Sequence, residues 1–251
     1  MLISIAAAAA PKAAENPYGL MQALEEGGLI SQTVFGILCI FSFFSFYIMF
    51  TKLIEQQKII NQAKKVRTTF WRSASLKEGS SKLEKNSAFK QLVDDGITAQ
   101  AHHGQLTDPV EAHDWMHGSL ARSEAAINSK LGTGLAFLAT VGATAPFIGL
   151  FGTVIGIYRA LIKIGASGQA SIDAVAGPVG EALIMTAMGL AVAVPAVLAY
   201  NWLQRRNKGI AEDLNGFSVD LLGYLVSGGS VRPSAAAAPT AAVGKPAPAK
   251  A

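Results

Sequence analysis

The sequence predicts an all-α integral membrane protein with three transmembrane helices and long cytoplasmic helical extensions. Charged residues make up only 15% of the 251 residues, whereas a soluble domain usually carries about 25%. The deficit is concentrated in three long stretches with almost no charge, and a helix that crosses a bilayer needs roughly 20 apolar residues. Outside these stretches, apolar residues recur at helical spacing. Together these observations make fully buried helices of a soluble protein a poor explanation.

The charge-free stretches set the boundaries of the chain's parts. The first lies between Glu26 and Lys52, the second between Lys130 and Arg159, and the third has Glu181 as its only charge. We therefore expect an N-terminal segment at 1–26, transmembrane helices at 27–51, 131–158 and 174–204, a helical loop at 52–130, a short link at 159–173, a further helix at 205–227 and an Ala/Pro-rich disordered tail at 228–251.

The distribution of Lys and Arg predicts the orientation. One such residue, Lys12, precedes the first span, twelve lie in the 52–130 loop, and six follow the third span. Positive residues near membrane ends favour the cytoplasmic side. The sequence therefore predicts a multi-pass protein of the bacterial inner membrane, with the N-terminus and the 159–173 link in the periplasm and the C-terminus in the cytoplasm.

The cytoplasmic segments are expected to be helical. Helical spacing continues past the first span to Phe70, a turn is expected at 79–81, and a second helix is expected to end near Gly104. Asp108 and Pro109 have the pattern of a helix start, and we expect one uninterrupted helix from there into the second span. A 3–4 pattern also predicts a continuous helix from Ala174 to about Val226.

Small residues form a stripe along each of the last two spans. The first is Gly142, Ala145, Gly149, Gly152 and Gly156, and the second includes Ala182, Thr186, Gly189, Ala193 and Ala196. Helices in lipid associate through close packing at small residues, because lipid tails are as apolar as the side chains. We expect both stripes to be buried in contacts between helices, with packing alone as the simplest role for the glycines.

Glu181 is the most informative residue. A charge near the middle of a membrane costs a few kcal/mol on insertion scales, and nothing basic lies within the apolar runs to pair with it. The side chain must face the interior, be protonated part of the time, or meet a group from another subunit. Burial brings the protonation of a carboxyl closer to neutral pH, as a proton carrier requires. The alternative is a structural carboxylic acid that stays neutral.

Other chemistries have little support. His113 and His117 have the spacing of a metal-binding helix, but no third ligand is evident, and a solvated helix face is the better interpretation. No Gly-rich loop follows a strand, and the net charge of +4 is modest. We expect no metal, no cofactor, no nucleic acid and no enzymatic activity.

Two segments resemble the ExbB family, which belongs with TolQ and the MotA flagellar stator: PFIGLFGTVIGI at 146–157 and GEALIMTAMGLAVAVPAVLAYN at 180–201. The resemblance implies that Glu181, Thr153 and Thr186 form the proton pathway. It also implies a ring of five copies around a pore, an ExbD-like single-span protein in that pore, and a TonB-like protein. The complex would use the proton-motive force to drive outer-membrane import of iron chelates and vitamin B12.

Three alternatives remain open from the sequence. A TolQ-type subunit of the Tol-Pal system is the alternative within the family. A secondary transporter that moves a solute itself is disfavoured, because there are three spans, one ionisable membrane residue and no inverted repeat. A structural scaffold leaves the cost of burying Glu181 unexplained.

Overall fold

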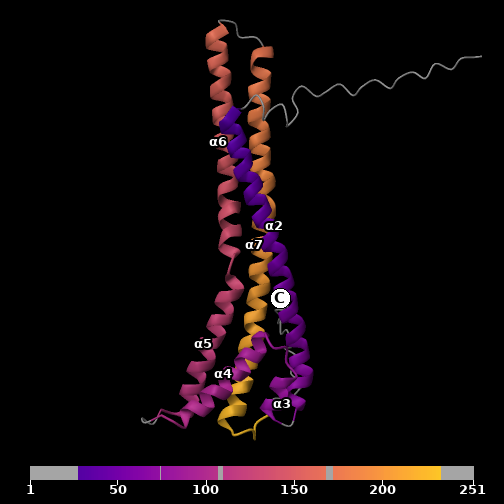
Figure 1. Ribbon diagram of the computed structural model, residues 1–251, viewed down its shortest axis with the longest axis vertical. Coiled ribbons are helices and arrows are strands. Elements are labelled where there is room, and N and C mark those ends of the chain that lie inside the picture. The colour runs from indigo at the N-terminus through magenta and orange to yellow at the C-terminus, as the bar shows by residue number, and fades with distance from the viewer. Residues whose placement is uncertain (1–27, 74, 107–109, 168–171, 233–251) are drawn as a thin grey trace, which may run out of the picture. The chain divides into compact units, whose positions relative to one another are not determined.

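The computed structural model describes residues 28–73, 75–106, 110–167 and 172–232. Every regular element in these ranges is a helix, which confirms the predicted all-helical class (Figure 1). Three of the helices are long and apolar enough to cross a membrane. The expectations for residues 1–26 and for the tail beyond Arg232 lie outside the described residues.

Helix α2 (Gly28–Thr69) is uninterrupted, and a short 3₁₀ helix, η1 (Phe70–Arg72), follows it. The single span and the helical pattern after it are therefore one helix. The expected turn at 79–81 is wrong, because these residues belong to a short helix, α3 (Leu76–Ser81), whose first turn is capped by the Ser75 hydroxyl. Gly79 leaves room for Phe70, because a Cβ at this position would lie 2.8 Å from the Phe70 ring.

Helices α4 (Ala88–His103) and α5 (Ala112–Gly132) follow. The end of α4 at its cap Gly104 confirms the predicted boundary. Asp108 and Pro109 lie outside the described residues, and the described part of α5 has Glu111 at its N-cap.

One uninterrupted helix into the second span was expected, and this is wrong. Helix α5 stops at Gly132, and α6 (Leu135–Ser167) starts after Thr133 and Gly134. Gly134 has φ +86°, a conformation that glycine adopts without a steric penalty. By contrast, α7 (Ile172–Val226) is continuous as expected, with Pro178 and Pro195 inside it.

The chain forms two compact units, and α2 and α7 each contribute to both. The first unit contains α2 up to Met49, α6 and α7 up to Asn201. Its core is small and mostly aliphatic, with Val34, Leu38, Val141, Ala145, Met185, Val192, Ala193 and Ala196 buried. Large apolar side chains such as Phe43, Phe147 and Leu183 are exposed around it.

The second unit contains residues 50–133 and 202–232 of the described chain. Its core is built from larger side chains, among them Phe70, Phe89, Leu92, Met116, Leu120, Leu214, Phe217 and Leu221. A buried polar connection joins its helices. The Gln56 amide donates to the Leu203 carbonyl (2.9 Å) and to Asn207 (2.6 Å), and Asn207 in turn donates to the Leu131 carbonyl (3.0 Å).

Candidate functional site in the apolar unit

Glu181 lies inside the first unit, with a relative exposure of 3%. It is in the first part of α7 and accepts a hydrogen bond from the Ser31 hydroxyl on α2. Ser31 is itself 1% exposed and lies one turn after Gly28, where the described part of α2 begins. A hydroxyl can donate to an ionised carboxylate and can accept from a protonated one. The Ser31 hydroxyl can therefore remain a hydrogen-bond partner of this carboxyl with or without a proton on it.

Sequence reasoning missed Ser31. A serine near the start of an apolar run has no spacing relation to a residue 150 positions away, and only the packing of α2 against α7 brings the two together. The signal in the sequence was indirect: a polar residue in a charge-free helix gains a partner when it faces another helix.

Glycines of α6 allow this helix to approach α7 on both sides of Glu181. A Cβ on Gly156 would lie 3.0 Å from the Pro178 carbonyl and 3.0 Å from Ala182 Cβ. A Cβ on Gly152 would lie 2.8 Å from Met185 Cβ and 3.4 Å from Val34 on α2. The carboxyl is therefore held in a three-helix contact whose neighbouring side chains are small or apolar.

Further along the same contact, the two helix backbones nearly touch. A Cβ on Gly149 would lie 2.7 Å from the Met185 carbonyl oxygen, and one on Gly189 would lie 2.7 Å from the Ala145 carbonyl oxygen. A Cβ on Gly142 would collide with the Val197 side chain. All three glycines are buried. Since a backbone carbonyl cannot move aside as a side chain can, the positions of Gly149 and Gly189 require glycine.

Thr153 and Thr186 are both half-buried. The Thr153 hydroxyl donates to the Leu150 carbonyl of its own helix (2.7 Å). No hydrogen bond links Glu181 to either threonine, and all three residues are described. Thr186 lies beside α6, because its Cα is 3.3 Å from the position of a Cβ on Gly149.

An apolar groove of about 500 Å³ opens between α2 and α6, lined by Leu29, Ile30, Thr33, Val34, Ile37, Thr144, Phe147, Ile148 and Phe151. Glu181 does not line this groove. In the second unit, His113 and His117 stack with ring centroids 6.1 Å apart. No group of three potential metal ligands is found in the described ranges.

The fold and the buried carboxyl define the class: a helical membrane protein with one buried carboxyl among the described residues of its apolar unit. Residues 84–215 match the model of the MotA/TolQ/ExbB proton channel family. The chain belongs to this family.

Three relatives illustrate the match. The Xanthomonas campestris pv. campestris biopolymer transport protein ExbB is 40% identical over 198 residues, covering 75% of this chain and 78% of the relative. The protein of the same name from Neisseria gonorrhoeae is 53% identical over 117 residues, covering 47% of this chain and 53% of the relative. The Tol-Pal system protein TolQ of Haemophilus influenzae is 33% identical over 203 residues, covering 76% and 87%.

Proposed function

We propose that this chain is an ExbB-type motor subunit of the bacterial inner membrane. In this proposal it uses the proton-motive force to energise outer-membrane import of iron chelates and vitamin B12. The observation that carries the proposal is the buried Glu181 carboxyl, which accepts a hydrogen bond from Ser31 in a largely apolar unit. The higher identity to the ExbB protein of Xanthomonas than to TolQ of Haemophilus, over similar shares of the chain, favours ExbB.

The proposed topology follows the sequence. Residues 1–26 and the 159–173 link lie in the periplasm, and the 52–130 loop and the C-terminal part of α7 lie in the cytoplasm. The Lys and Arg residues that follow the first and third apolar runs in the sequence support this orientation. They include Lys52, Lys58, Lys64, Lys65, Arg205, Arg206 and Lys208.

The proposed assembly is a ring of five copies, with an ExbD-like single-span protein in the central pore and a TonB-like protein attached. Exposed apolar side chains on α6 and α7, such as Phe147, Leu150, Leu183 and Leu190, can contact lipid or neighbouring helices. Thr153 and Thr186 are partly accessible, and a hydroxyl that donates within its own helix can still accept a hydrogen bond. They therefore suit contact with a partner's group along the pathway.

In the proton step, Glu181 is the proposed carrier, Thr153 and Thr186 lie along the proposed pathway, and the proton-motive force drives the transfer. The carboxyl takes up a proton from the periplasmic side and releases it inward. One elementary charge that moves through 100 mV releases roughly 2.3 kcal/mol, so several protons can support a mechanical stroke. A carboxyl shielded from bulk water prevents a continuous leak, because the proton must be carried by the side chain itself.

The test is Glu181→Gln, which keeps shape and hydrogen-bonding capacity but cannot titrate. In a strain without its own copy of this subunit, we expect Glu181→Gln to give a protein of normal abundance and assembly that does not support uptake of an iron chelate. Glu212→Gln, which removes an exposed carboxylate from the same helix, is the matched control and should retain uptake. Full energy-dependent uptake by Glu181→Gln would leave Glu181 as a structural acid.

The TolQ-type alternative is tested in the same way. If the wild-type chain restores outer-membrane integrity to a strain without TolQ, but does not restore iron-chelate uptake to a strain without ExbB, the Tol-Pal assignment is correct and the import assignment is not.

A further inference from the structure

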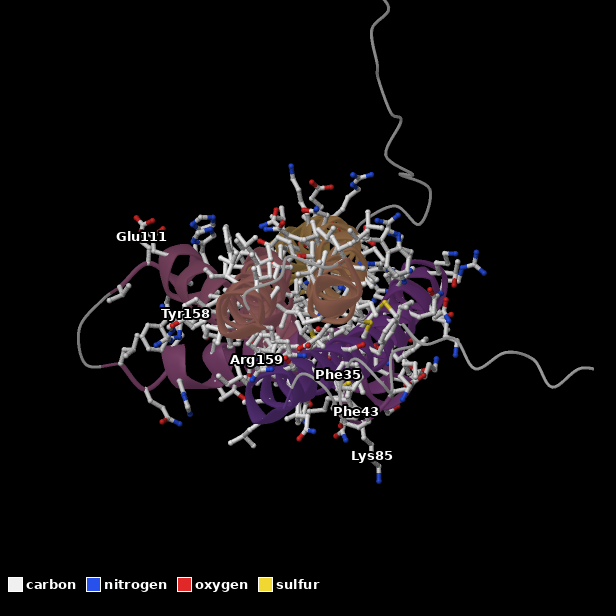
Figure 2. The ribbon with its side chains drawn as sticks, turned by 90° about the horizontal axis from the view of Figure 1, so that it is seen from above. Phe35, Phe43, Lys85, Glu111, Tyr158 and Arg159 are labelled. Atoms are coloured by element: carbon white, nitrogen blue, oxygen red, sulfur yellow. The ribbon has the colours of Figure 1, made fainter. Side chains whose placement is uncertain are left out.

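Ser31 is a buried residue whose hydroxyl bonds to another helix. It lies on the buried face of α2 together with Val34 and Leu38, at spacings of three and four residues, and is 1% exposed. Its hydroxyl donates to the Glu181 carboxyl on α7. Seen from above, Figure 2 shows the exposed Phe43 on the side of α2 away from α7. The packed face of α2 thus presents a hydrogen-bond donor to α7.

Other hydroxyls of the first unit bond differently. Those of Thr33, Thr140 and Thr144 donate to the carbonyl four residues earlier in their own helix, at 2.7, 2.9 and 2.8 Å. A bond of this kind satisfies a hydroxyl without any contribution from a second helix. The bond from Ser31 instead constrains a side chain of another helix, and that side chain is the one buried carboxylate among the described residues of this unit.

Two sides of α7 meet two different helices around Glu181. Pro178 and Ala182 pack against α6, where a Cβ on Gly156 would lie 3.0 Å from the Pro178 carbonyl oxygen and 3.0 Å from Ala182 Cβ. Glu181 is next to Ala182 in the sequence, but its carboxyl bonds to Ser31 on α2. The carboxyl therefore occupies the α2 side of the helix contact.

The two threonines expected in the proton pathway do not hold the carboxyl in this position. Thr186 lies beside α6 and is about 140° around α7 from Glu181. The Thr153 hydroxyl donates to the Leu150 carbonyl of its own helix. Within the described residues the carboxyl is thus bonded to α2 and to neither threonine.

We propose that Ser31 is a positioning residue that holds the Glu181 side chain in a resting position on the α2 side of the contact. This rests on the proposed function, in which Glu181 carries the proton along a pathway that includes Thr153 and Thr186. A glutamate side chain turns about several single bonds, so the carboxyl can leave Ser31 by rotation of its own side chain. Because a hydroxyl can bond a carboxyl with or without a proton, Ser31 can hold the carrier in both states.

The experiment measures how often Glu181 leaves this position, by its reaction with dicyclohexylcarbodiimide, an apolar reagent that forms a covalent adduct with carboxyl groups. The full chain is used in inner-membrane vesicles together with its partner subunits. A carboxyl of a residue only 3% exposed is closed to so bulky a reagent, so the labelling rate reports the time spent away from Ser31. Mass spectrometry locates the adduct on Glu181, and Glu181→Gln gives the background.

The variants separate the hydrogen bond from packing. Ser31→Ala removes the hydroxyl and Ser31→Thr keeps it, whereas Ser31→Cys has a similar size but only a weak donor. Ser45→Ala is the matched control, because Ser45 is another buried serine of α2, 6% exposed, and its hydroxyl has no hydrogen-bond partner in the described chain. Thr186→Val tests whether this threonine holds the resting carboxyl.

We expect Ser31→Ala and Ser31→Cys to be labelled on the order of tenfold faster than the wild type, the factor that corresponds to the loss of one ordinary hydrogen bond. Ser31→Thr, Ser45→Ala and Thr186→Val should be labelled at the wild-type rate. A wild-type rate in Ser31→Ala or Ser31→Cys, or an equal acceleration in Ser45→Ala or Thr186→Val, would overturn the proposal. If the extra methyl group of Ser31→Thr prevents assembly, the contrast between Ser31→Cys and Ser45→Ala decides.

This outcome is separable from that of the proposed function. If Ser31→Ala is labelled faster while Glu181→Gln retains uptake, the positioning by Ser31 stands and the carrier role fails. If Glu181→Gln abolishes uptake and the labelling rate does not depend on Ser31, the carrier role stands and this inference fails.

Discussion

The two units of this chain pack their helices in opposite ways. In the first unit, α6 and α7 approach until glycine backbones touch, and large apolar side chains remain exposed. In the second unit, large side chains such as Phe89 and Leu214 are buried, and polar groups cover much of the outside. In lipid, burying a leucine side chain contributes little free energy, so close contact between the helices stabilises their packing instead. In water, the apolar area removed from solvent dominates.

Charge follows the same division. The second unit pairs its charges at the surface, as in the Arg67–Asp213 pair (2.5 Å) and the Lys82–Glu78 pair (2.6 Å), which are partly exposed. Such pairs contribute little to stability. The first unit carries few charges, and Glu181 is buried among small and apolar residues. A single charge in the first unit has a stronger electrostatic effect on its neighbours than a surface charge of the second unit, because few other charges screen it.

The largest effect should come from the core of the second unit. Phe89 is 2% exposed and meets Phe217 edge to face, with ring centroids 5.3 Å apart. Phe89→Ala should lower the free energy of unfolding by about 3–5 kcal/mol, from lost burial and the cavity left behind. Thermal unfolding of the purified protein measures it, with the exposed Val219→Ala as control. Equal melting temperatures for the two variants would contradict a water-facing unit held by apolar burial.

The next effect concerns a single methyl group in the first unit. Gly149→Ala places a Cβ 2.7 Å from the Met185 carbonyl oxygen, and overpacking of this kind costs about 1–3 kcal/mol. Gly36→Ala is the matched control, because nothing lies within 4 Å of its Cβ position. Native mass spectrometry and thermal melting should show impaired assembly for Gly149→Ala alone. Indistinguishable behaviour of the two variants would argue against backbone contact as the basis of packing in this unit.

The smallest expected effect concerns a partly buried carboxyl of the second unit, Asp220, and tests the contrast in electrostatics between the two units. Burial raises the pKa of Asp220 above its usual 3.8, and the nearby Arg67 partly opposes the shift. The folded state then holds this proton more tightly than the unfolded state, so stability falls as pH rises from about 3.8 through the folded pKa. Asp220→Asn should raise stability at neutral pH by a few tenths of a kcal/mol, because the group is partly exposed and screened.

The check is denaturant unfolding of Asp220→Asn and wild type at neutral pH and near pH 3.5. The difference should shrink at the lower pH, where Asp220 is largely protonated in both states. A difference that grows toward acid would mean that Asp220 is stabilised as a carboxylate.

Some features were accessible from the sequence because they depend on local physics. The apolar length of each span, the helical pattern through Val226 and the cost of burying Glu181 are properties of residues close together in the chain. The break at Thr133–Gly134 was missed even though glycines were present. A glycine in a helical pattern is compatible with both continuation and interruption, and the positive φ of Gly134 decides between them.

The partners of Glu181 depended on the tertiary structure. The sequence by itself determined that an acidic residue lies in an apolar helix and needs compensation. Only the packing of α2 against α7 decided that Ser31 supplies the hydrogen bond. The physical reason is that helical periodicity specifies which residues share a face of one helix, whereas side-chain packing specifies which faces meet.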